Sequence, residues 1–224
     1  MKRRQVLGVT LLIAGAMAVL GGSAATLADD EVITLRFSGA NGEGDVHTDG
    51  IKKVAEELER LSGGTMKLEL YLNSTLFAQD AEMEAIMTGD LDLCYTSSQW
   101  VAEYVDAAKM FTAMYLYNDV EHLDAVLNGD IGKALFKQVS DETGTFPLAA
   151  YYYGARDCLM RDGSKDYMTP EDMEGVVMRE PNTEAWLFVG EALGANPVPL
   201  AFGEMYLSLQ TGTIDAVENP LRLS

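Results

Sequence analysis

The sequence predicts an α/β protein built as a bilobal clamp, in which two α/β units are joined by an extended segment. Between residues 32 and 96, short β-rich runs alternate with helical periods in the order β-α-β-α-β. This order predicts a parallel sheet with right-handed crossovers. A second alternating series runs from residue 176 to residue 217, and an apolar run, Phe146–Tyr153, precedes it. We therefore expect a first lobe at residues 29–151 and a second lobe beginning at 152–224.

The first 28 residues are typical of a cleaved signal peptide. Lys2, Arg3 and Arg4 precede the apolar run Val6–Leu20, and small residues follow through Ala28. This is the layout of a secretory signal, and the apolar run is short for a membrane span. The paired arginines fit both a general secretory route and a twin-arginine route. We expect export to the periplasm.

The elements of the first unit follow from hydrophobic periodicity. Val32–Phe37 is rich in β-formers, and apolar residues from Ile51 to Leu61 recur at helical spacing. Met66–Leu72 alternates as a second strand, Gln79–Met87 is helical, and Leu91–Thr96 returns as a strand.

Two further helices are expected at Val101–Lys109 and Val120–Glu142, and Phe146–Tyr153 is expected to be a strand that leaves the first lobe. Thr169-Pro170 has the composition of a helix start, with acids in the first turn. The second unit is expected to contain, in chain order, a strand at Val176–Arg179, a helix at Glu184–Leu193, a strand at Pro197–Leu200, a helix at Gly203–Gln210 and a strand at Thr213–Val217.

Charge and cysteine content exclude several classes of function. The formal net charge is −19, and loss of the three basic residues of the signal would take it to −22. Nucleic-acid binding needs basic patches, and anionic lipid also repels such a surface. Cys94 and Cys158 could pair, but both lie in apolar runs where buried thiols are common. The two histidines have no metal-ligand spacing, and we expect no metal or cofactor.

Ligands of parallel sheets gather at the carboxyl ends of the strands. This rule singles out Ser38–Asn41, Asn73–Asp80 and Thr96–Ser98 in the first unit, and Arg179 at the end of an apolar run in the second. Arginine can hold a carboxylate through two parallel hydrogen bonds, so it suits an anion site in an acidic protein.

The region from Gly175 to Pro220 resembles a known family, the extracytoplasmic solute-binding subunits of TRAP transporters (DctP type), and especially their sialic-acid and sugar-acid branch. The matching residues are Arg179, Pro181-Asn182, Gly194-Ala195-Asn196-Pro197, Ala201-Phe202-Gly203-Glu204-Met205-Tyr206 and Glu218-Asn219-Pro220. The resemblance implies a periplasmic-binding-protein-like clamp of the class II type. Compared with the family, the second lobe and the hinge look incomplete, as in a member truncated at its C-terminus.

The resemblance also implies the ligand-binding residues of the second lobe. Arg179 would form the bidentate bridge to the ligand carboxylate. Asn182, Phe202 and Asn219 follow it by 3, 23 and 40 residues and match ligand-contacting positions. Arg156 matches the second arginine of the family, although an ion pair with a neighbouring acid is the alternative. Two uncompensated arginines would favour closure of the lobes around an anion.

In the first lobe the resemblance implies that Asp80, Thr96, Ser97 and Asn41 face the ligand. Serine stands where the sialic-acid branch has glutamate, and Ala40 where it has asparagine. These departures favour a smaller acid, such as a uronate or an aldonate. Glu180 replaces a small apolar residue and could orient Arg179.

The resemblance predicts a monomeric receptor that docks to the small and large TRAP membrane subunits. Two alternatives stay open: an exported α/β enzyme acting on sugar acids, and a sensory binding protein of the same fold. The sequence has no G-x-S-x-G elbow and no histidine beside a plausible nucleophile, so nothing singles out an enzyme.

Overall fold

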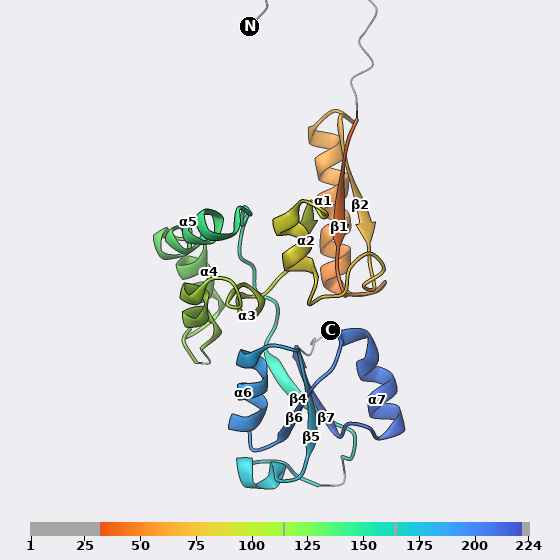
Figure 1. The fold of residues 1–224 in the computed structure, drawn as a ribbon, viewed down its shortest axis with the longest axis vertical. Coiled ribbons are helices and arrows are strands. Elements are labelled where there is room, and N and C mark those ends of the chain that lie inside the picture. Colours follow the sequence, from red (N-terminus) through yellow and green to blue (C-terminus); the bar gives the residue numbers. More distant parts are fainter. Residues whose placement is uncertain (1–31, 114, 164, 221–224) are drawn as a thin grey trace, which may run out of the picture. The chain divides into compact units, whose positions relative to one another are not determined.

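The computed structural model describes residues 32–113, 115–163 and 165–220 (Figure 1). The predicted signal peptide, residues 1–28, lies outside the described residues. The described strands form two sheets, one of three strands and one of four, with helices between the strands. The predicted α/β class is confirmed.

The first sheet is parallel, with the strand order β2-β1-β3. Its elements are, in chain order, β1 (Ile33–Ser38), α1 (Val46–Leu61), β2 (Met66–Tyr71), α2 (Glu82–Thr88) and β3 (Leu93–Cys94). The central strand β1 ends in two fully buried residues, Phe37 and Ser38. Because all three strands run in one direction, their carboxyl ends share one edge of the sheet.

Local sequence sets the limits of α1. The Asp45 side chain accepts a hydrogen bond of 2.9 Å from the backbone N–H of His47, which caps the first turn. Ile51 is buried on the inner face of the helix. The helix ends where Gly63 and Gly64 adopt positive φ angles of 66° and 86°, which glycine tolerates without strain.

The helices between β3 and β4 (Arg156–Met160) in the sequence differ from those expected. The elements are α3 (Ser98–Val101), the 3₁₀ helix η1 (Asp106–Thr112), α4 (Val120–Leu127) and α5 (Asp130–Thr143). The single helix expected over Val120–Glu142 was wrong, because Asn128-Gly129 separates two helices. The Asn128 side chain bonds to both backbone groups of Ala150, at 3.0 and 3.1 Å, instead of continuing the helix.

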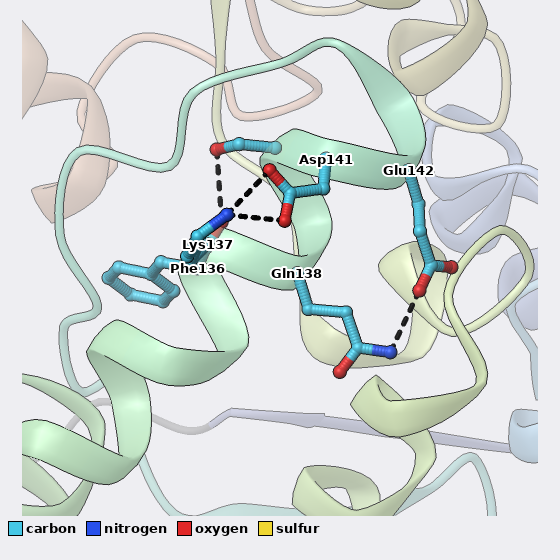
Figure 2. A network of polar contacts seen from close by, with 6 residues as sticks. Phe136, Lys137, Gln138, Asp141 and Glu142 are labelled. Carbon is cyan, nitrogen blue, oxygen red and sulfur yellow. Dashed lines mark hydrogen bonds and ion pairs between the residues drawn. The ribbon is translucent and has the colours of Figure 1, made fainter.

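Side-chain pairs one turn apart support α5 on its exposed face (Figure 2). Lys137 Nζ lies 2.8 and 2.5 Å from the two carboxylate oxygens of Asp141, and Gln138 donates to Glu142 at 2.8 Å. Such pairs contribute a few tenths of a kcal/mol each, about 0.2–0.5 kcal/mol in isolated helices.

The strand expected over Phe146–Tyr153 was also wrong. These residues are not in a strand, and β4 begins at Arg156. Phe146 and Leu148 are 79% and 72% exposed. Without a neighbouring strand, the backbone of Ala150 bonds to the Asn128 side chain instead of to a sheet.

The second sheet has the order β4-β7-β5-β6, in which β4 alone is antiparallel to its neighbour. Its elements are β4 (Arg156–Met160), η2 (Pro170–Met173), β5 (Val177–Glu180), α6 (Glu184–Ala192), β6 (Asn196–Pro199), η3 (Phe202–Glu204), α7 (Met205–Thr211) and β7 (Ala216–Pro220). Figure 1 shows α6 and α7 on opposite sides of the strands. The expected helix start at Thr169 is confirmed as a capping box with Asp172.

Candidate carboxylate site

Arg179 lies at the carboxyl edge of the second sheet and is buried, with 2% of its surface exposed. It is the penultimate residue of β5, between Val198 of β6 and Val217 of β7. Its Nε donates a hydrogen bond of 2.8 Å to the carbonyl oxygen of Leu200. Burial lowers the pKa of Arg179 to about 10, an effect that Glu180 opposes and Arg156 reinforces. The guanidinium therefore stays charged at neutral pH.

The chain after β5 keeps this edge compact. Pro181 is buried directly after the strand, and the Thr183 side chain accepts a hydrogen bond of 3.2 Å from the N–H of Trp186 to begin α6. Asn182 is exposed in this short turn. Asn182 therefore lies three residues beyond Arg179, in an exposed turn at the carboxyl end of β5.

Asn219 and Phe202 come to the same edge from two other segments. Arg179 lies opposite Val217 in β7, and alternate residues of a strand share a face, so Asn219 lies on the same side of the sheet as Arg179. Phe202 is half-buried and follows by two residues Leu200, whose carbonyl holds Arg179. The carboxyl edge of the second sheet therefore gathers four of the predicted site residues.

Arg156 reaches the same edge from the start of β4, opposite Pro220. Strand register places it on the other side of the sheet from Arg179, together with Glu218. Its Nε forms an ion pair with Glu218 Oε1, its Nη2 bonds to the Glu218 carbonyl at 3.1 Å, and its guanidinium lies 4.1 Å from the Trp186 ring centroid. The expectation of two uncompensated arginines was wrong for Arg156, because Glu218 already neutralises it.

Two buried acids accompany the arginines. Glu180 is 0% exposed and Glu218 is 3% exposed. Within the described residues, both carboxyl oxygens of Glu180 and the Oε2 of Glu218 lack a hydrogen-bond partner. Burial raises the pKa of Glu180 to about 8; Glu218 adds to the shift, and the two arginines oppose it. From the sequence, Glu180 was expected only to orient Arg179, and Glu218 was part of the family match without a role of its own.

The site residues predicted near the first sheet lie at its carboxyl edge. Asn41 follows β1, is half-buried and accepts hydrogen bonds from the Tyr153 hydroxyl (3.2 Å) and the Asn73 N–H (3.1 Å). Thr96 is exposed after β3, and Ser97 is half-buried at the start of α3. Asp80 is exposed just before α2. The structure places each residue at a strand end or the following turn, as the carboxyl-end rule requires.

An aromatic cluster at this edge was missed by sequence reasoning. His47 and Tyr153 stack with ring centroids 4.0 Å apart and planes 8° apart. Tyr151 lies 5.2 Å from Tyr95, which meets the Phe37 ring edge-on at 5.1 Å. His47 is half-buried in this cluster. The run of three tyrosines at residues 151–153 indicated an aromatic surface but not its partners.

A buried acid also lies under this edge. Glu82 is 2% exposed, and its Oε1 accepts a hydrogen bond of 2.8 Å from the Ser38 hydroxyl. Burial raises the pKa of Glu82 to about 7; the Ser38 hydrogen bond opposes the shift and Asp80 adds to it. Glu82 therefore keeps its proton to a higher pH than an exposed glutamate does.

Other chemistry is limited in the part of the chain that the structure describes. Cys94 and Cys158 are unpaired thiols. Over residues 32–113, 115–163 and 165–220, no three His, Cys, Asp or Glu side chains are grouped to hold a metal ion. No described helix has the length and apolar character needed to cross a membrane.

The profile of one protein family, "bacterial extracellular solute-binding protein, family 7" (DctP), matches residues 37–223. Because the match covers most of the sequence, the chain belongs to this family. A curated solute-binding protein from Roseobacter denitrificans is 32% identical over 171 residues, which cover 76% of this chain and 51% of that protein.

Two solved structures from the same organism show the same fold. A TRAP periplasmic solute-binding protein with bound 3-deoxy-D-manno-oct-2-ulosonic acid is 36% identical, with a TM-score of 0.79 over 85% of this chain and 62% of that chain. Another, with bound β-D-glucuronate, is 34% identical, with a TM-score of 0.74 over 83% of this chain and 61% of that chain. The chain thus spans between about half and two thirds of the lengths of these relatives.

Proposed function

We propose that this protein is the extracytoplasmic receptor of a TRAP transporter, which captures a small sugar acid in the periplasm for uptake. The observation that carries the proposal is the burial of the Arg179 guanidinium without an ion-pair partner among the described residues. Arg179 is a buried cation whose hydrogen bonding, within the described residues, consists of the Nε contact to Leu200. No carboxylate of the described residues forms an ion pair with its guanidinium.

A buried charge without a partner is costly, so the remaining N–H groups of Arg179 favour an incoming anion. A carboxylate matches the planar fork of arginine and binds it through two charge-assisted hydrogen bonds. Asn182 and Asn219 supply amide groups for the carboxylate and the adjoining hydroxyls, and Phe202 covers an apolar face of the ligand. Arg156 acts more remotely, since Glu218 already occupies it.

The first-lobe residues are proposed to contact the rest of the ligand. Asn41, Asp80, Thr96 and Ser97 are polar groups suited to sugar hydroxyls, and none of them is a cation. Related proteins were solved with 3-deoxy-D-manno-oct-2-ulosonic acid and with β-D-glucuronate. The ligands bound in these relatives support a sugar acid, such as a uronate or an aldonate, as the class of ligand.

The remaining parts of the proposal follow from this role. Residues 1–28 are a cleaved signal peptide, and residues 29–151 and 152–224 belong to two lobes. The receptor acts as a monomer, delivers its ligand to the small and large membrane subunits, and performs no turnover.

A thermal-shift screen of organic acids on the whole protein tests the proposal. The panel comprises 3-deoxy-D-manno-oct-2-ulosonate, D-glucuronate, D-galacturonate, L-galactonate and succinate. An acid at 100 times its Kd should stabilise the fold by about 2.7 kcal/mol through mass action. Arg179→Ala should lose most of this stabilisation. Arg161→Ala should keep it, because Arg161 forms an exposed pair with Asp215 at 2.8 Å.

Two outcomes would overturn the proposal. The absence of a shift with every acid of the panel would contradict the receptor function. An unchanged shift in Arg179→Ala would contradict the role of Arg179 in binding the carboxylate. Recovery of a chemically altered acid would favour the exported enzyme instead.

A further inference from the structure

The Glu180 carboxyl group is the least satisfied polar group at the proposed site. It is 0% exposed, and neither of its oxygens has a hydrogen-bond partner among the described residues. An ionised carboxylate in such a place loses its hydration without compensation, which is among the most costly arrangements in a protein interior. The neutral acid avoids most of this cost.

The surroundings of Glu180 reinforce this preference. Its side chain lies under α6 at Gly190, where an added Cβ would be only 3.3 Å from the Glu180 Cγ and 2.7 Å from Pro197. Gly190 and Pro197 are not titratable, so α6 and β6 offer the carboxyl group no charge at this contact. The absence of a side chain at Gly190 is what allows Glu180 to fit beneath the helix.

The charged and titratable groups that face Glu180 come from three strands. Glu218 of β7 is one position beyond Val217, the partner of Arg179, and so lies beside Glu180 on the same side of the sheet. Arg156 and Cys158 of β4 share that side, whereas Arg179, the preceding residue of β5, points to the opposite side of the sheet and acts on Glu180 through its charge. Arg156 is already bound to Glu218, so it is not free to neutralise a second carboxylate at full strength.

The charges of Arg179, Arg156, Glu218 and Glu180 then have a simple consequence. With Glu180 neutral, two arginines and one carboxylate leave a net charge of +1, which matches one ligand carboxylate. With Glu180 ionised the net charge is zero, and the ligand carboxylate meets an additional buried anion. The proton on Glu180 therefore decides how strongly this edge attracts an acid.

We propose that Glu180 enters the ligand complex as a neutral carboxylic acid, so that binding of a sugar acid is coupled to the Glu180 proton. This inference rests on the proposed receptor function. Glu180 is a positioning residue here, since it acts through the charge presented to Arg179. Ionisation weakens binding, and ligand binding draws a proton onto Glu180 when that group is ionised in the free protein.

The sign of the pH dependence follows from burial, which raises the pKa of Glu180 to about 8. Affinity should be constant from about pH 6 to 7 and should fall above pH 8. For complete coupling, the loss between pH 7 and pH 9 is about tenfold. Sugar acids stay fully ionised across this range because ordinary carboxyl pKa values lie near 4.

Isothermal titration of the whole protein with 3-deoxy-D-manno-oct-2-ulosonate and with D-glucuronate, between pH 6.5 and pH 9, tests the proposal. The wild type should lose about tenfold in affinity, and at pH 8.5 it should take up protons, seen as heats that depend on the buffer. Glu180→Gln, which keeps the shape without the proton, should bind with the same affinity throughout. Glu191→Gln, on the exposed surface of α6, should behave as the wild type.

A titration of the free protein avoids dependence on the ligand. The side-chain carboxyl resonances of ¹³C-glutamate-labelled protein should include one that titrates near pH 8 and is missing in Glu180→Gln. If Glu180 titrates near pH 4, or if the affinity of Glu180→Gln falls with pH as in the wild type, the inference is wrong while the receptor function stands. If neither acid binds any variant, the inference falls together with the proposed function.

Discussion

The carboxyl edges of the two sheets carry different chemistry. The second sheet presents Arg179 and Arg156 together with the buried acids Glu180 and Glu218. The first sheet presents the amide of Asn41 and stacked rings, and its buried acid, Glu82, has a hydroxyl partner in Ser38. This difference underlies the proposed division of roles, in which the second sheet binds the carboxylate and the first sheet contacts the rest of the ligand.

The two edges also differ in how their polar groups are satisfied. Glu82 accepts a hydrogen bond at 2.8 Å, whereas Glu180 and one oxygen of Glu218 have no partner among the described residues. Buried polar groups are rarely left unsatisfied, and those that are often mark functional sites. The buried Thr48 hydroxyl of α1 also lacks a partner among the described residues, but the unsatisfied carboxyl oxygens, which are costlier to bury, lie at the second edge and support the proposed site there.

The largest stability effect is expected at Arg156, which holds the second edge together. Arg156→Ala leaves Glu218 buried without its cation and uncovers the Trp186 ring. Loss of one partner from a buried ion pair should lower the free energy of unfolding by about 3 kcal/mol. Chemical denaturation at pH 7.5 measures the change.

Two controls sharpen this prediction. Arg161→Ala, which breaks an exposed pair, should cost less than about 1 kcal/mol. Adding Glu218→Gln to Arg156→Ala should recover much of the loss, because no buried charge then remains unpaired. Equal effects of the two arginine substitutions would contradict the expectation that the more buried pair contributes more to stability.

An effect of at most similar size, which depends on pH, is expected at Glu82 in the first sheet. Burial raises its pKa from 4.5 to about 7, so the folded protein holds a proton that the unfolded chain releases. The contribution of Glu82 to stability is therefore complete below pH 4.5 and is lost as the pH rises to about 7. The total loss is about 3 kcal/mol at most.

Denaturation of the wild type and Glu82→Gln between pH 4.5 and pH 8 checks this expectation. The difference in unfolding free energy should grow in favour of the variant up to pH 7 and then stay constant. Glu84→Gln, on the exposed side of α2, should show no such trend. A difference that does not vary with pH would mean that Glu82 is ionised in the folded protein.

The smallest effect is expected for Asn41, because its proposed contacts with the ligand are neutral hydrogen bonds. Asn41→Ala should weaken binding of D-glucuronate by about fivefold, the equivalent of one neutral hydrogen bond of about 1 kcal/mol. Titration calorimetry measures the change. A loss as large as that in Arg179→Ala would contradict the division of roles between the sheets.

Local periodicity predicted most of the fold, because strands and helices leave different spacings of apolar residues. It predicted the parallel first sheet and placed Arg179 at a strand end. It failed at Asn128-Gly129, although this dipeptide is a turn signal, and at Phe146–Tyr153, where composition favours a strand but no described strand pairs with it.

The contacts between distant segments, and the burial that results from them, could not be predicted from the sequence. The ion pair of Arg156 with Glu218 joins residues 62 positions apart, and Glu180 is enclosed by Gly190 and Pro197. The tyrosine run at residues 151–153 likewise gave no sign that Tyr153 would stack on His47. Such contacts depend on strand order and register, which periodicity alone does not specify.

The central claim, that Arg179 binds the ligand carboxylate, is tested most directly by a double-mutant cycle. The affinities of the wild type and Arg179→Ala are measured for D-glucuronate and for its neutral amide, D-glucuronamide. A charge-assisted bidentate contact predicts a coupling energy of at least about 2 kcal/mol between the guanidinium and the carboxylate. Additive effects, with a coupling below about 0.5 kcal/mol, would contradict the claim.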